Sequence, residues 1–178
     1  MDNTCHNSLI MSFDGILDGQ SMTPIHPMDN VETRMNTSSL SSYQMDNVET
    51  KLRTISSFLR TRMSTSSQER QFQLAIAIEC RNFFRGLTVV TEQPIQTIYV
   101  DSRNTRHSLG TGRIDIYMPE LGLLIELKKQ RPQPSHELQL RGYMENAAIN
   151  GLCCKLGVLI CFFVDKGTLQ CSLKTIPT

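Results

Sequence analysis

Two apolar runs in this chain each carry a carboxylate near the middle, and this restricts how they can be buried. Residues 112–129 read GRIDIYMPELGLLIELKK, with Asp115 in the first run and Glu126 in the second. Their β-branched and aliphatic residues predict two strands, 113–118 and 123–129, joined by a tight PELG turn. The charged groups must therefore be accommodated within a sheet.

The alternation of side chains along a strand indicates where these charges point. Residues two apart share a face, so Glu126 and Lys128 point the same way. Because the two strands follow each other through a short turn, we expect Asp115 and Glu126 to lie about 5–7 Å apart, opposite or diagonal. An alternative stays open, in which Asp115 caps the hairpin end while Glu126 and Lys128 lie on a solvated face.

The remaining pattern predicts the fold class. A helix is expected from a Ser66 N-cap onward, because apolar residues then recur at helical spacing. The further expected elements are a strand at 87–100, a polar loop at 101–112, a helix at 136–150, and strands at 155–164 and 168–176. The order helix, three strands, helix, two strands predicts an α/β fold with a mixed sheet flanked by helices.

The first 65 residues differ in composition from the rest. They are rich in Ser, Thr and Asn, and MDNVET occurs at 28–33 and again at 45–50. We therefore expect a flexible leader over residues 1–65 and a folded domain over 66–178. An alternative for residues 48–63 is an amphipathic helix that docks on the domain or on a protein partner.

Composition excludes several classes of protein. The formal net charge is only +1, so the chain is not a polybasic nucleic-acid binder. Six cysteines occur without a C-x-x-C pair or zinc spacing, which predicts reduced thiols in an intracellular, cytoplasmic or nuclear, protein. No apolar run reaches the roughly 18 residues of a membrane span, so no membrane association is expected.

The two carboxylates and the lysine suit a metal site. Burying two neighbouring carboxylates costs on the order of several kcal/mol unless a cation neutralises them. Mg²⁺ is bound by one or two carboxylates together with water and substrate phosphates. A lysine beside them can orient or deprotonate a water, or hold the charge that develops on a phosphate. The arrangement predicts metal-assisted hydrolysis of phosphodiesters.

This segment resembles the PD-(D/E)xK nuclease superfamily, whose motif is an Asp on one strand and E-x-K on the next. Here the motif reads GRID and ELK, and a following helix carries ELQLRGY, with Gln139 and Tyr143 on one helix face. The resemblance implies a restriction-endonuclease-like fold and a nuclease that uses Mg²⁺ or Mn²⁺. The expected substrate is nucleic acid, with DNA favoured over RNA.

The layout is most similar to the GxxExxY-type proteins within that superfamily. Of the three residues that name this pattern, only the glutamate occurs here, as Glu69. Ser66 stands at the position of the glycine and Phe72 at that of the tyrosine. Glu79, later in the same predicted helix, is the alternative acidic residue. The resemblance covers about residues 67–175 and leaves the first 65 unexplained.

The resemblance also assigns roles to individual residues. Lys128 would activate water, while Gln139 and Tyr143 would position the phosphate or the lysine. The implied metal ligands are the carboxylates of Asp115, Glu126 and Glu69 and the carbonyl of Leu127.

Other hypotheses remain open. The fold could be catalytically inactive and act as a nucleic-acid- or protein-binding module. The leader could recruit a protein partner, and the domain could form a homodimer. His136, at the start of the second helix, is expected at the surface.

Overall fold

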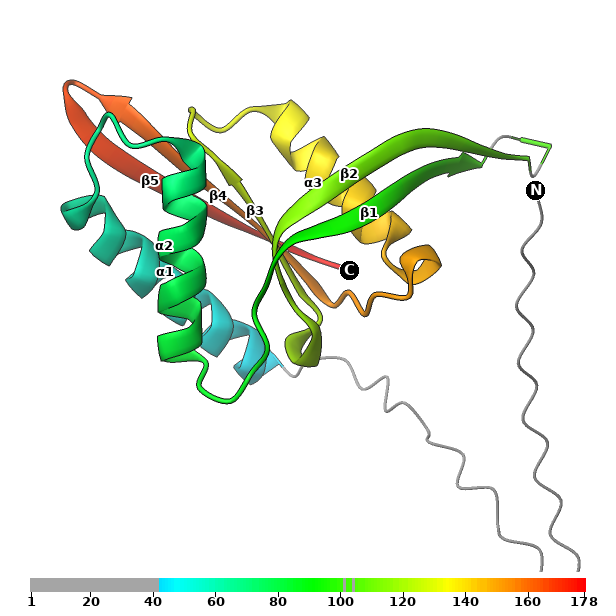
Figure 1. Cartoon of the computed structure of the whole chain (residues 1–178), viewed down its shortest axis with the longest axis horizontal. Coiled ribbons are helices and arrows are strands. Elements are labelled where there is room, and N and C mark those ends of the chain that lie inside the picture. The colour runs from blue at the N-terminus through cyan, green and yellow to red at the C-terminus, as the bar shows by residue number, and fades with distance from the viewer. Residues whose placement is uncertain (1–41, 101, 104) are drawn as a thin grey trace, which may run out of the picture. The chain divides into compact units, whose positions relative to one another are not determined.

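The computed structural model describes residues 42–178, except residues 101 and 104. The order of elements is two helices, three strands, a helix and two strands, which confirms the predicted α/β fold with a mixed sheet (Figure 1). The elements are α1 (Ser42–Arg62), α2 (Glu69–Phe83), β1 (Val90–Val100), β2 (Arg106–Met118), β3 (Leu123–Lys128), α3 (Pro134–Asn146), β4 (Leu156–Asp165) and β5 (Thr168–Pro177), with short 3-10 turns at Pro119–Leu121 and Ala148–Asn150. None of these helices has the length and apolar character needed to cross a membrane.

The five strands form one sheet in the order β1-β2-β3-β4-β5. Neighbouring strands are antiparallel except β3 and β4, which are parallel and are connected through α3. A parallel pair requires such a crossover, because a tight turn can only join antiparallel strands. The crossover starts α3 at Pro134, shortly after β3 ends at Lys128, so a short connection joins the helix with Gln139 and Tyr143 to the end of β3.

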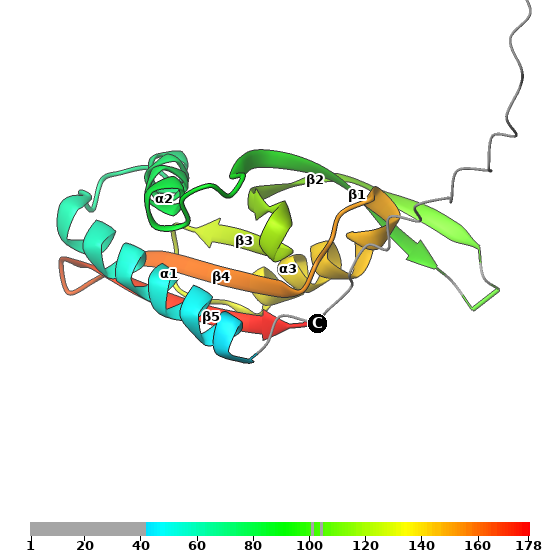
Figure 2. The same ribbon diagram turned by 90° about the horizontal axis from the view of Figure 1, so that it is seen from below.

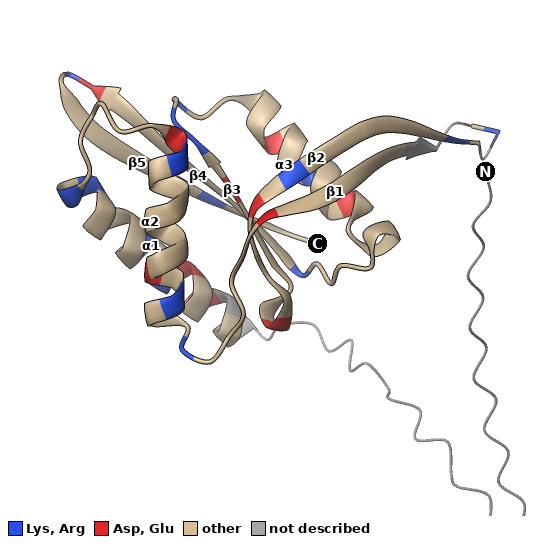
Figure 3. Ribbon diagram, viewed as in Figure 1, with Lys and Arg blue, Asp and Glu red and all other residues tan. Residues whose placement is uncertain are grey.

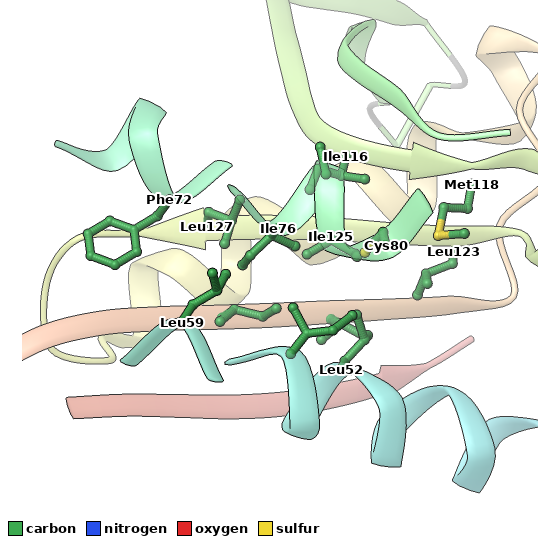
Figure 4. Close-up of a cluster of buried hydrophobic side chains, with 14 of the residues drawn as sticks. Leu52, Leu59, Phe72, Ile76, Cys80, Ile116, Met118, Leu123, Ile125 and Leu127 are labelled. Carbon is green, nitrogen blue, oxygen red and sulfur yellow. The ribbon is translucent and has the colours of Figure 1, made fainter. Parts of the chain in front are cut away.

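One face of the sheet is covered by α1 and α2 (Figures 1 and 2). Alternate residues of β3 point into this core: Leu123, Ile125 and Leu127 are all fully buried. Phe72 of α2 stacks on Phe162 of β4, with ring centroids 4.4 Å apart. Figure 4 shows Phe72 of α2 and the β3 residues Leu123, Ile125 and Leu127 within this core. The apolar half of β3 therefore anchors the strand.

The opposite face of the sheet is covered by α3. Its buried residues include Leu140 and Tyr143, which pack with Leu124 of β3 and Ile114 of β2. Glu126 follows Leu124 by two positions, so it belongs to this side of the sheet. The charged residues of β3, Glu126 and Lys128, therefore lie on the α3 side of the sheet. Leu123, Ile125 and Leu127 face α1 and α2.

The expected boundary of a flexible leader at residue 65 is wrong for the described part of that segment. Helix α1 lies N-terminal to the boundary, yet Leu52, Ile55 and Leu59 are buried in the same core as α2 and the sheet. The docking helix expected over 48–63 is confirmed, and it begins earlier, at Ser42. Its apolar residues recur at three and four positions, and this single stripe suffices to bury one helix face. The repeat copy at 28–33 lies outside the described residues.

The expected polar loop at 101–112 is largely strand. β2 begins at Arg106, and β1 and β2 form a long antiparallel ribbon that extends beyond the rest of the sheet (Figure 1). The side chains of β2 are exposed up to Thr111, which explains why their polar character resembled a loop. The N-cap of α2 is Gln68 instead of Ser66, and the side chain of Gln71 accepts a hydrogen bond from the Gln68 N–H.

Replacement of a buried α1 residue tests whether this helix belongs to the folded core. We expect Leu52→Ala to lower the free energy of unfolding by about 2–5 kcal/mol, because it leaves a cavity between α1 and the sheet. Thr54→Ala, at an exposed position of the same helix, should change it by less than about 0.5 kcal/mol. Urea denaturation of the full chain measures both. Equal, small effects would mean that α1 does not pack on the sheet in solution.

Candidate functional site

Asp115 lies at the point where β2 separates from β3. Backbone pairing between the two strands ends at Ile116 and Ile125. Continued by one position, the same register brings Asp115 opposite Glu126, and the charge of Asp115 raises the pKa of Glu126. The two carboxylates are therefore neighbours where the pairing of β2 and β3 ends, while the expected separation of about 5–7 Å stays a prediction.

The side chain of Asp115 provides the hydrogen-bond acceptor that β3 would otherwise find on a neighbouring strand. Its Oδ2 accepts a hydrogen bond from the Leu127 backbone N–H at 2.7 Å. Beyond Ile125 this edge of β3 has no β2 backbone to pair with, while its other edge continues to pair with β4 as far as Lys128. The alternative that Asp115 caps the hairpin end is wrong, because the residue bridges the two strands away from the turn.

Glu126 is the most deeply buried charged group of the site. Its side chain is only 2% exposed, so the alternative of a solvated face is wrong. Lys128 Nζ donates a hydrogen bond to its Oε1 at 2.6 Å, and Lys128 itself is mostly covered. The other oxygen, Oε2, is buried and has no hydrogen-bond partner. A buried polar atom without a partner carries an unmet desolvation cost, so this oxygen is ready to accept a ligand.

Burial raises the pKa of both carboxyl groups. For Glu126, desolvation and then the charge of Asp115 raise the pKa to about 7, against the lowering effect of Lys128. For Asp115, desolvation raises the pKa to about 6, although the Leu127 N–H and the Lys128 charge act in the opposite direction. Perturbed pKa values of this kind concentrate at functional sites, because catalysis requires charges held in unfavourable surroundings.

Lys128 stays protonated at this site. Desolvation lowers its pKa, but the hydrogen bond to Glu126 and the charges of Glu126, Glu69 and Asp115 outweigh this and raise the pKa above 10.5. Its ammonium group is therefore suited to hold an anion or orient a water. It is poorly suited to remove a proton.

Glu69, at the first turn of α2, is the acidic helix residue that reaches this region. Its Oε2 accepts a hydrogen bond from the Lys129 N–H at 2.8 Å, and its charge contributes to the raised pKa values of Asp115 and Glu126. Glu79 lies nearly three turns later along α2, where Asn82 contacts it. Of the two candidates, the structure brings Glu69 to the site.

Gln139 and Tyr143 lie on one face of α3, as expected. Gln139 Nε2 donates to the Tyr143 hydroxyl at 2.8 Å. Tyr143 is buried and packs directly against Gly112 of β2, where a Cβ atom would lie 2.6 Å from its hydroxyl oxygen. The glycine three positions before Asp115 thus gives this tyrosine its place beside β2.

Two supporting residues were missed by reasoning from the sequence. Gln73 of α2 is buried, and its Nε2 donates both to the Asp115 carbonyl at 3.0 Å and to Glu92 at 2.7 Å. Glu92 adopts a left-handed backbone (φ 58) and also pairs with Arg113. The signal was an amide side chain on the apolar face of a helix, which is buried only when it is hydrogen-bonded. Together these residues fix the backbone on which Asp115 stands.

The prediction that His136 lies at the surface is wrong. Its ring is buried, its Nε2 lies 2.7 Å from the side-chain nitrogen of Gln130, and its Nδ1 has no partner. It lies one turn before Gln139 on α3, and the charge of Lys128 helps burial to lower its pKa. The contact between Gln130 and His136 links the two ends of the segment that connects β3 to α3.

The donor atoms present fit a hard divalent cation with few protein ligands. They are the carboxylates of Asp115 and Glu126, including the partnerless Oε2, and the neighbouring carbonyl of Leu127. Across residues 42–178, apart from 101 and 104, no three or more His, Cys, Asp or Glu side chains converge in a way that could hold a metal. Glu69 is therefore not grouped with the other two acids. Mg²⁺ commonly retains several waters and uses only one or two carboxylates, so two acids suffice for it.

Comparison with known proteins leaves the family open. No protein-family model matches this chain, and no curated protein matches it either. Among solved structures, the crystal structure of SSO0001 aligns with a TM-score of 0.42 and 16% sequence identity, over 61% of this chain and 50% of that one. The chain thus spans half the length of that protein.

The pKa of Glu126 determines how stability changes with pH. Between its usual pKa of 4.5 and about 7, the folded chain binds more protons at this site than the unfolded chain, so the free energy of unfolding falls as pH rises. Glu126→Gln removes this destabilisation but also the bond from Lys128. We expect it to raise the free energy of unfolding at pH 8 by about 1–3 kcal/mol, and by little at pH 4.

Glu137→Gln is the matched control for this experiment. The hydrogen bond from Lys174 lowers the pKa of Glu137, so its ionised form stabilises the fold, and its replacement should reduce stability at pH 8. Urea denaturation at both pH values measures the change in the free energy of unfolding of each variant. At pH 8 it should rise in Glu126→Gln and fall in Glu137→Gln. A loss of stability in Glu126→Gln at pH 8 would contradict the inference that the ionised Glu126 carboxylate destabilises the fold.

Proposed function

We propose that this chain is a metal-dependent nuclease that hydrolyses phosphodiester bonds, with DNA as the substrate in preference to RNA. The observation that carries the proposal is the buried Glu126 carboxylate, which has one oxygen without a partner beside Asp115 and Lys128. A purely structural site would leave no buried carboxylate oxygen without a partner, because its desolvation is costly. The preference for DNA rests only on the resemblance to PD-(D/E)xK nucleases.

Asp115 and Glu126 would hold Mg²⁺ or Mn²⁺, with the carbonyl of Leu127 beside them. When bound, the ion supplies a Lewis acid that lowers the pKa of a coordinated water and neutralises phosphate charge. The chain contributes a rigid position for both acids. The Leu127 N–H fixes Asp115, and the buried strand β3 fixes Glu126.

Lys128 would act as a cation. Its ammonium is held by Glu126 and keeps its proton, so it would donate hydrogen bonds to a phosphate oxygen or to the attacking water. Gln139 and Tyr143 line the same side of the sheet on α3, and would orient the phosphate or Lys128. Glu69 would assist from α2, through its hold on the Lys129 backbone.

A cleavage assay with single- and double-stranded DNA and RNA, in Mg²⁺, Mn²⁺ or chelator, tests the proposal. We expect metal-dependent cleavage that falls by about 10²–10³ in kcat for Glu126→Gln and for Lys128→Met, since each removes a charge aimed at the reacting phosphate. Glu79→Gln is the matched control on α2 and should retain full activity. Cleavage that survives in Glu126→Gln, or needs no metal, would refute the mechanism. Nucleic-acid binding without any cleavage would instead indicate an inactive nuclease-like fold.

The contact between Gly112 and Tyr143 provides a separate test of the α3 residues. Gly112→Ala places a methyl group against the Tyr143 ring, which must shift and weaken the bond with Gln139. We expect kcat/KM for DNA to fall about 10–100-fold, because small misplacements of positioning groups are costly. Tyr143→Phe retains the ring and loses only the hydroxyl, so it separates position from hydrogen bonding. Unchanged kinetics in both variants would remove Tyr143 from the site.

A further inference from the structure

A small polar pocket lies between α1 and β5, apart from the residues of the candidate nuclease site. Its volume is about 190 Å³, which is enough for one small anion and some water. The lining residues are Arg53, Ser56, Ser57 and Arg60 of α1 and Cys171 and Leu173 of β5. The four α1 residues stand at positions i, i+3, i+4 and i+7 and therefore share one helix face. Figure 3 marks the basic residues of this helix in blue.

Ser56 supplies a buried donor in this pocket. The residue is only 3% exposed, and within the described residues its hydroxyl has no partner other than the weakly bonding thiol of Cys171. A serine within a helix can bond to the carbonyl four residues earlier, but this one does not. It lies against the thiol of Cys171, whose pKa burial raises to about 11, so the thiol stays neutral near pH 7. A ligand oxygen would satisfy the hydroxyl.

Two arginines flank this donor. Arg53 and Arg60 are seven residues apart, about 10 Å along the helix axis, so their guanidinium groups can converge on a ligand between them. Arg53 also bonds to Glu49, whose second oxygen accepts a hydrogen bond from Thr175 of β5. Arg60 forms no ion pair within the described part of the chain, and the pocket lining contains no acidic residue. The net positive charge of the pocket therefore comes from Arg60.

We propose that this pocket binds a phosphate group, either as inorganic phosphate or as a phosphate monoester. Guanidinium forks match phosphate oxygens, and hydroxyl donors complete the set of hydrogen bonds that such an anion accepts. The bound group would join α1 to β5 and so stabilise the packing of the first described helix on the last strand. This inference is independent of the proposed nuclease activity.

Thermal unfolding and calorimetric titration of the full chain with inorganic phosphate, at constant ionic strength against chloride, test the proposal. We expect phosphate to raise the Tm of the unmodified chain, and Ser56→Ala and Arg60→Gln each to weaken binding about tenfold. Arg62→Gln is the matched control, because Arg62 lies on the same helix end but stacks on Phe58 outside the pocket. Lys128→Met should retain the effect, which separates this pocket from the candidate nuclease site.

Phosphoserine and serine distinguish the two sources of the phosphate group. Binding of phosphoserine as tight as that of phosphate indicates a monoester, whereas weaker binding indicates the free anion. Arg60→Lys retains the positive charge but loses the two-pronged geometry of the guanidinium group, so it should bind phosphate with intermediate strength. Such graded binding would show that the weaker binding of Arg60→Gln is not caused by unfolding. The proposal is overturned if phosphate stabilises no more than chloride, or if Arg62→Gln weakens binding as much as Arg60→Gln.

Discussion

The hydrogen bond from the Leu127 N–H to the Asp115 carboxylate is the contact on which the candidate site depends. Where β2 leaves β3, the Leu127 N–H would be buried without an acceptor, at a cost of about 1–3 kcal/mol. The side chain of Asp115 replaces the departed backbone and lets the sheet open without that cost. The same separation of the strands leaves the Asp115 charge close enough to the buried Glu126 carboxylate to raise its pKa.

The site also depends on the division of β3 between two faces. Leu123, Ile125 and Leu127 bind the strand to the core under α1 and α2, and this apolar burial offsets the cost of placing charges on the other face. Glu126, a buried carboxylate with a raised pKa, thus lies on a strand whose apolar residues are fully buried. A loop could not hold two repelling carboxylates in place, because it would move to separate them.

Much of the fold could be predicted from the sequence, because it depends on local periodicity. The strands around Asp115 and Glu126, and the helices that carry Glu69 and Gln139, follow directly from alternation and helical spacing. The docking of α1 on the domain was predicted only as an alternative to a flexible leader, because the polar composition of this segment obscures its single apolar stripe. Gln73, Glu92 and His136 could not be predicted, because their importance comes from partners between 6 and 42 positions away. Burial of a polar residue depends on such partners, which no local pattern reveals.

The packing of α1 against β5 has a consequence for how the chain folds during synthesis. Glu49 and Thr175, which bond across this contact, are 126 positions apart. Helix α1 therefore leaves the ribosome long before β5, and of its neighbours only α2 follows it at once. At translation speeds of about 5–20 residues per second, the contact between α1 and β5 cannot form for several seconds or more. A long-range contact of this kind slows folding, since the chain must close a large loop before any packing energy is gained.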